Sequence, residues 1–70
     1  MRFSDKEREA DQILRYFEFD HLPEHLAKIS SIFADTAKYT IDTCKRNAER
    51  TVALRKLLEA KDAAVRSALD

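Results

Sequence analysis

Residues 45–56 contain five basic side chains, and Glu49 is the only acidic one among them. Guanidinium groups bind phosphate and carboxylate oxygens through paired, charge-assisted hydrogen bonds, and the first turn of a helix favours a negative charge. The segment therefore has the composition of an anion-binding site. The same pattern is typical of a solvated helix face on which glutamate and lysine side chains pair, and this interpretation also stays open.

Arg50 is the residue of this segment most suited to hold an anion. It falls on an apolar stripe that continues through Leu54 and Leu57, so we expect its side chain to point partly toward a neighbouring helix. A half-buried arginine needs a negative partner, which is either a glutamate of another chain or a phosphate group. Lys61 lies on the same stripe and raises the same question, although its stem can also follow apolar surface while its charge reaches water.

A second candidate group consists of the aromatic residues Tyr16, Phe17 and Phe19, followed by His21. Phenylalanines are more often core residues than ligand contacts. Flat rings near a basic half of the chain are also what a nucleotide site requires, because rings stack on bases while arginine and lysine hold phosphates. The pattern alone leaves both interpretations open.

No set of residues predicts catalysis. Residues 21–25 read H-L-P-E-H and match an inverted zinc-protease pattern, but Pro23 interrupts the turn that the two histidines would share, and no third ligand is evident downstream. Cys44 has no histidine near it in sequence and falls on a helical apolar stripe, which predicts a packing role. Because the chain contains no glycine, it has no glycine-rich phosphate loop. We expect a protein that is not an enzyme and uses no metal or cofactor.

The composition indicates the size and surroundings of the protein. Its 70 residues carry 13 Lys and Arg against 13 Asp and Glu, with one cysteine. A core of this size supplies about 3–5 kcal/mol, so we expect self-association to complete it. Net neutrality argues against non-specific nucleic-acid binding. The chain shows no secretory signal or membrane span, and a lone cysteine suits a reducing compartment. We expect a soluble, cytoplasmic protein.

The elements that must position these groups are all expected to be helical. The absence of glycine and the single proline leave little turn chemistry for a β-architecture. The segment Ser4–Glu7 is a capping box, so we expect a short helix from Ser4 to about Tyr16. An extended linker over residues 17–22 should then lead into a helix at Pro23, since proline suits the first turn.

Beyond the proline, apolar residues recur at intervals of three and four. A single helix over residues 23–69 would be about 70 Å long, so we favour an antiparallel hairpin with its turn at Lys45–Ala48. Asn47 serves there either as a left-handed residue or as the cap of the following helix. We divide the chain into a capped N-terminal helix, residues 1–16, and a helical-hairpin domain, residues 17–70. The stripe predicted for the first arm is Leu26, Ile29, Phe33, Ala37, Ile41 and Cys44.

Phe17–Pro23 and Cys44–Arg66 together carry a resemblance to a known family. The best piece is the polar turn followed by Glu-Arg-x-x-Ala-Leu-x-x-Leu-x-Glu-Ala, which begins at Glu49. These stretches resemble the small helical-hairpin sponges that phages use against CBASS immunity, and the similarity covers roughly residues 16–69.

The resemblance implies a non-catalytic binding protein in the cytoplasm of the host. Members of the family are homo-oligomers, commonly hexamers, that bind the cyclic di- and trinucleotides made by bacterial cyclases and so starve the downstream effector. Dinucleotides lie between protomers, where an aromatic residue near the N-terminal segment stacks on a base. Trinucleotides occupy separate sites near the threefold axes, and an arginine at the start of the last helix contacts phosphates.

Carried over to this chain, the resemblance assigns the phosphate-binding arginine to Arg50. Phe19 is the first choice for the stacking aromatic residue. Family members often have tyrosine where this chain has phenylalanine, so a hydroxyl contact there is open. The family's lysine partner of the aromatic residue is also open, because Lys28 and Lys38 are displaced by several positions. The predicted ligand-binding residues are Tyr16, Phe17, Phe19, His21, Arg46, Arg50 and Thr51.

The leading hypothesis is therefore a sponge for cyclic oligonucleotides, whose partners are its ligands and further copies of itself, with no DNA and no membrane. The alternative is a helical-hairpin homo-oligomer without a small ligand, in which Arg50 and Lys61 pair with acidic residues of other subunits. A third hypothesis is weak binding to DNA or RNA through residues 45–56.

Overall fold

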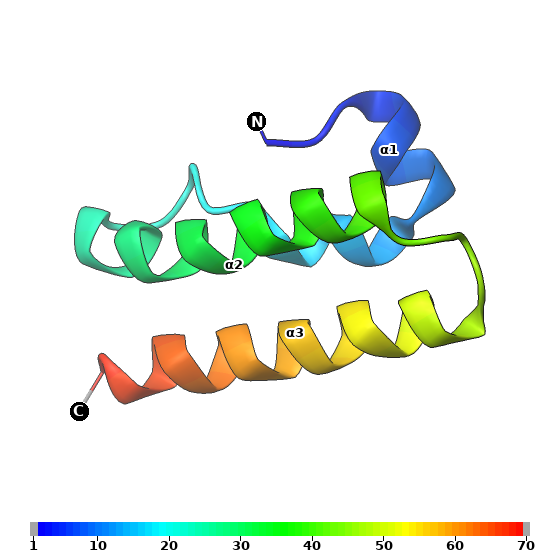
Figure 1. The fold of residues 1–70 in the computed structure, drawn as a ribbon. Helices are drawn as coiled ribbons and strands as arrows, with labels where there is room; N and C mark the ends of the chain where they lie inside the picture. Colours follow the sequence, from blue (N-terminus) through cyan, green and yellow to red (C-terminus); the bar gives the residue numbers. More distant parts are fainter. Residues whose placement is uncertain (1, 70) are drawn as a thin grey trace.

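The computed structural model describes residues 2–69, which form four helical elements (Figure 1). The elements are α1 (Asp5–Ala10), the 3₁₀ helix η1 (Gln12–Phe17), α2 (Glu24–Thr43) and α3 (Ala48–Ser67). The two long helices lie antiparallel and side by side, and η1 packs against both. The described part of the chain is thus all-helical with a long helix pair, as predicted. None of its helices has both the length and the apolar character needed to cross a membrane.

The first helix begins where the capping box predicts. The hydroxyl of Ser4 accepts a hydrogen bond from the backbone N–H of Glu7 at 3.2 Å, and the carboxylate of Glu7 accepts one from the backbone N–H of Ser4 at 2.9 Å. Two N–H groups that a helix start would leave without partners are thereby satisfied.

The prediction of one helix from Ser4 to about Tyr16 is wrong, because the helix is interrupted at Asp11. This residue has φ −131° and ψ 89°, outside the helical region, and it separates α1 from η1. Residues three apart share a face in a 3₁₀ helix. The change of helix type therefore places Leu14 and Phe17 on one side, where both are buried.

The hairpin forms at the predicted position, with two arms of 20 residues each. Pro23 is the N-cap of α2, so the helix starts one residue later than expected. Asn47 caps α3, because its side-chain oxygen accepts the backbone N–H of Arg50 at 3.0 Å. The left-handed alternative for Asn47 is wrong: its φ is −152°, and no residue from 2 to 69 has a positive φ.

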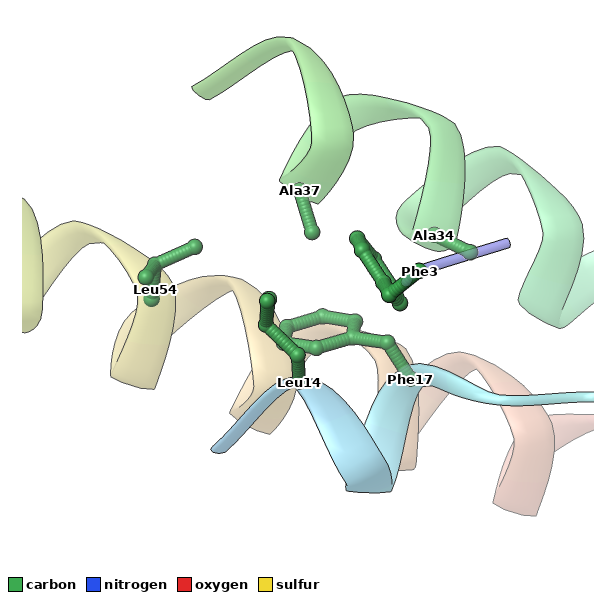
Figure 2. Close-up of a cluster of buried hydrophobic side chains, with 6 residues drawn as sticks. All are labelled: Phe3, Leu14, Phe17, Ala34, Ala37 and Leu54. Carbon is green, nitrogen blue, oxygen red and sulfur yellow. The ribbon is translucent and has the colours of Figure 1, made fainter. Parts of the chain in front are cut away.

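The core lies between the two long helices and is filled from the N-terminal segment, residues 2–17 (Figure 2). The large side chains of this segment enter beside small ones on α2, and the ring of Phe17 is fully buried. One core therefore crosses the boundary between residues 16 and 17. Its buried apolar members are Phe3, Leu14, Phe17, Ala34, Ala37 and Leu54.

The predicted apolar stripe of α2 is confirmed in part, because Ala37 is buried and Phe33 and Ile41 pack against the core. The buried positions of α2 are Ser30, Ala34 and Ala37, whereas Phe33 is only partly buried. Cys44 was expected to pack but is exposed. The reason is that α2 ends at the preceding residue, so Cys44 is extended, with φ −93° and ψ 142°, and leaves the helical periodicity.

Candidate functional site

Arg50 lies in the first turn of α3 and is only 8% exposed, so it does point toward neighbouring elements as predicted. Its Nη1 donates to the backbone carbonyl of Ile41 at 3.2 Å, and its Nη2 donates to Oδ2 of Asp11 at 2.6 Å. The negative partner of Arg50 is thus an aspartate of the same chain. The sequence pattern did not indicate this partner, which lies 39 positions away.

The carboxylate of Asp11 is shared by two arginines. Its Oδ2 also accepts from Nη1 of Arg46 at 3.0 Å, and Nη2 of Arg46 donates to the backbone carbonyl of Ala10 at 2.5 Å. The Asp11 side chain is 17% exposed, whereas that of Arg46 is largely exposed. We call Asp11, Arg46 and Arg50 the Arg–Asp cluster. One carboxylate faces two guanidinium groups, so the cluster carries a positive charge in excess.

An open cavity of about 370 Å³ adjoins this cluster at the turn. Its lining residues are Cys44, Lys45, Asn47, Glu49, Arg50 and Ala53. Helix α3 begins beside this cavity, and the partial positive charge of its N-terminus adds to the attraction for an anion. Thr51 is exposed, and its hydroxyl donates to the backbone carbonyl of Asn47 at 3.4 Å.

The four predicted residues of the aromatic group lie in different environments. The Phe17 side chain is fully buried, so its ring has no free face for a base. Phe19, the first choice from the sequence, packs partly buried against the core. Tyr16 is 64% exposed and His21 is also exposed. Tyr16 and His21 therefore offer the most accessible surface of the four, and Phe19 keeps a smaller part of its surface exposed.

Tyr16 and His21 line a groove of about 310 Å³ together with Lys61. Lys61 runs along this surface with only 14% of its side chain exposed, and its Nζ lies 3.0 Å from Oδ1 of Asp62. The apolar part of the groove wall consists of Leu22, Leu58 and Val65. The groove also borders Ser30, whose hydroxyl oxygen is buried without a hydrogen-bond partner.

Ser30 is a buried polar residue that the sequence pattern does not indicate. It is 1% exposed, although serine at a helix surface usually reaches water. A buried hydroxyl without a hydrogen-bond partner costs free energy. Its position four residues before the buried Ala34 is the only sequence signal that could have placed it on the inner face.

The structure separates the predicted site residues into two clusters within one chain. Arg50 and Lys61 are eleven positions apart on α3, which corresponds to about 16 Å along the helix axis. The Arg–Asp cluster therefore lies at the turn, and the groove with Tyr16 lies toward the opposite end of α3. Within one chain, the two clusters are therefore separate surfaces.

The lysine that accompanies the exposed aromatic residue in the groove is Lys61. Lys28 pairs with Glu24 on the exposed side of α2. Lys38 donates to Oε2 of Glu7 at 2.5 Å and lies away from the groove. Its hydrogen bond lowers the pKa of Glu7 below the ordinary value of 4.5. The same bond raises the pKa of Lys38 above 10.5.

His21 and His25 are both exposed, on either side of Pro23. Among residues 2–69, no three His, Cys, Asp or Glu side chains are grouped closely enough to hold a metal ion.

The fold and these two clusters define a small helical-hairpin protein with a basic turn and a separate aromatic groove. No protein-family model matches the chain, and no curated protein or solved structure shows significant similarity to it.

Proposed function

We propose that this protein is a non-catalytic sponge that sequesters cyclic di- and trinucleotides within a homo-oligomer and so blocks CBASS signalling. The observation that carries the proposal is the presence of two distinct clusters suited to the two parts of a nucleotide. The Arg–Asp cluster is suited to phosphate, and the groove with Tyr16 and Lys61 is suited to a base. The sequence resemblance of Phe17–Pro23 and Cys44–Arg66 supplies the class of ligand.

The basic turn supports phosphate binding by its charge and geometry. The guanidinium groups of Arg46 and Arg50 converge on one carboxylate oxygen, at 3.0 and 2.6 Å. A phosphate oxygen accepts hydrogen bonds in the same way, and planar guanidinium forks match phosphate geometry. Lys45 and the start of α3 add positive potential at the mouth of the adjoining cavity.

The groove supports base binding by the kind of surface it offers. The exposed ring of Tyr16 can stack on a base, and stacking contributes about 1–3 kcal/mol per base. Leu58 and Val65 provide an apolar floor, while Lys61 brings a cation to its edge.

Self-association is supported by apolar side chains on the outer faces of the helices. Ile32 and Tyr39 are exposed on α2, seven positions apart and so on the same helix face, and Val52 is exposed on α3. The buried apolar core of the described chain has six members, few for a stable isolated domain. A symmetric assembly would cover these faces and bring copies of each cluster together.

Thermal unfolding with and without ligand tests the proposal. The probes are cyclic GMP–AMP, a panel of other cyclic dinucleotides and a cyclic trinucleotide. A ligand present at 100 times its Kd adds about 2.7 kcal/mol to the apparent stability. Native mass spectrometry of protein isolated from cells that express a cyclase would count subunits and copurified nucleotides together. The absence of any stabilisation across the panel would refute the proposed function.

The alternative function, a hairpin homo-oligomer without a small ligand, is favoured by one specific observation. Arg50 already has two partners inside its own chain, the carboxylate of Asp11 and the carbonyl of Ile41. This arrangement meets the requirement of a buried arginine for an anion without any nucleotide. A stable oligomer that shows no thermal response to the nucleotide panel would support this alternative.

A further inference from the structure

The position of Asp11 shows a relation between the N-terminal segment and the phosphate site. Its Oδ2 lies between the guanidinium groups of Arg46 and Arg50 and accepts a hydrogen bond from each. An anionic oxygen held between two arginines is also the arrangement that a bound phosphate would adopt. The carboxylate and a ligand phosphate therefore require the same donors.

The contacts of Asp11 are set by the break between α1 and η1. Its backbone, with φ −131° and ψ 89°, lies outside the helical region and ends α1 at this point. The neighbouring carbonyl of Ala10 accepts from Arg46 at 2.5 Å, so three hydrogen bonds tie the junction to the two arginines. In addition, the backbone carbonyl of Asp11 accepts the N–H of Leu14 at 3.0 Å. A movement of the Asp11 backbone away from the arginines would therefore disturb the hydrogen bond between Asp11 and Leu14 at the start of η1.

We propose that Asp11 is a built-in competitor of the ligand: its carboxylate occupies the phosphate position in the free protein and is displaced when a nucleotide phosphate binds Arg46 and Arg50. The inference rests on the proposed function, since it concerns the regulation of that same site. The open cavity beside Arg50 gives an anion access to this side chain. The free energy of the internal pairing is subtracted from the free energy of ligand binding, and binding loosens the junction of α1 and η1.

Isothermal titration of the wild type and of the variant Asp11→Asn tests the competition. The probes are cyclic GMP–AMP, a cyclic trinucleotide and inorganic phosphate. The asparagine still accepts hydrogen bonds but no longer carries the competing charge, so we expect about tenfold tighter binding, within the usual range of coupling between sites. The matched control is Glu9→Gln, which removes the same charge from an exposed residue of α1 outside the Arg–Asp cluster. The affinity of this control for each probe should equal that of the wild type.

Amide hydrogen exchange on the wild-type protein gives a readout that does not depend on the folding of a variant. Saturation with the bound nucleotide should accelerate exchange at the N–H groups of Asp11 and Leu14, while those of α2 and α3 are slowed or unchanged. A purely structural role of Asp11 predicts slower exchange at every one of these positions, because ligand binding would then only add stability.

The outcomes separate this inference from the proposed function. Equal or weaker binding by folded Asp11→Asn, or slower exchange at Asp11 and Leu14, overturns the competition while the sponge function stands. Failure of both proteins to bind any probe refutes the function and the inference with it. If Asp11→Asn binds inorganic phosphate more tightly than the wild type but not the cyclic nucleotides, the result supports the competition. It then assigns the Arg–Asp cluster to a free anion instead of a nucleotide.

Discussion

Lys38 of α2 donates a hydrogen bond of 2.5 Å to Glu7 of α1, across 31 positions of sequence. The other carboxylate oxygen of Glu7 accepts the backbone N–H of Ser4 at the helix cap. One carboxylate therefore completes the capping box of α1 and also ties α1 to the hairpin.

This pairing predicts a loss of stability in acid. The hydrogen bond from Lys38 and that from the Ser4 backbone lower the pKa of Glu7 in the folded protein. Its contribution to stability is then fully present above the ordinary pKa of 4.5 and is lost as the pH falls below that value. Urea unfolding at a series of pH values should show this decline in the wild type. Glu7→Gln should be less stable than the wild type near neutrality, and its free energy of unfolding should change less as the pH falls below 4.5. Parallel plots of the free energy of unfolding against pH for the two proteins would contradict the prediction.

Arg50→Lys should abolish the ligand-induced rise in melting temperature while the oligomer persists. Lysine keeps the positive charge near Asp11 but loses the planar fork that contacts two acceptors at once. Arg66→Lys is the matched control, because Arg66 is exposed on the same helix and far from the turn. An unchanged thermal response in Arg50→Lys would show that the phosphate site is wrongly assigned.

Asn47→Ala should destabilise the protein by about 1 kcal/mol, the usual cost of losing an N-cap side chain. The loss comes from the hydrogen bond to the backbone N–H of Arg50. Asn47→Ser keeps a capping oxygen and should restore most of the stability. Chemical denaturation of the three proteins measures the effect, and equal stability of the alanine variant and the wild type would rule out a capping contribution.

The neighbouring residues Tyr16 and Phe17 should respond to alanine in opposite ways. Phe17→Ala empties a fully buried position and should cost about 3–5 kcal/mol, enough to unfold a chain of this size. Tyr16→Ala removes an exposed ring, so it should leave stability nearly unchanged and weaken nucleotide binding by about 1–3 kcal/mol. Tyr16→Phe keeps the ring and should bind normally. Unaltered binding by Tyr16→Ala would exclude the groove as the base site.

Ser30→Ala tests whether the buried hydroxyl contributes to stability or to nucleotide binding. The buried hydroxyl of Ser30 has no partner in the free protein, so its removal should leave the free energy of unfolding unchanged or slightly raised. Nucleotide affinity should be unchanged, because the buried oxygen is not accessible from the groove. Calorimetric titration and urea unfolding measure the two quantities, and a clear loss of stability would mean that the hydroxyl has a partner in solution.

Local signals in the sequence account for much of the fold. The capping box at Ser4 and Glu7, the start of a helix next to Pro23, and the cap at Asn47 each depend on residues within a few positions of one another, so the sequence displays them directly. The burial of Arg50 was also predictable, since it follows from the helical spacing of the apolar residues beside it.

The remaining features depend on contacts between distant residues. The break at Asp11 and its pairing with Arg50 join positions 39 apart, and no local pattern indicates such a pair. The choice between core and ligand contact for Phe17 was equally undecidable, because burial follows from how the N-terminal segment docks. The wrong prediction for Cys44 has a simpler reason: the helical spacing of apolar residues reaches Cys44, but α2 ends one residue earlier, at Thr43.

The buried position of Phe3 has a consequence for the order in which the chain acquires its structure. Phe3, Leu14 and Phe17 are synthesised before Leu54, which completes their surroundings in the core. Contacts that span so much of the sequence form late, whereas the turn at residues 44–47 is local and can form early. The burial of these N-terminal side chains is therefore completed only when α3 docks on the preceding helices.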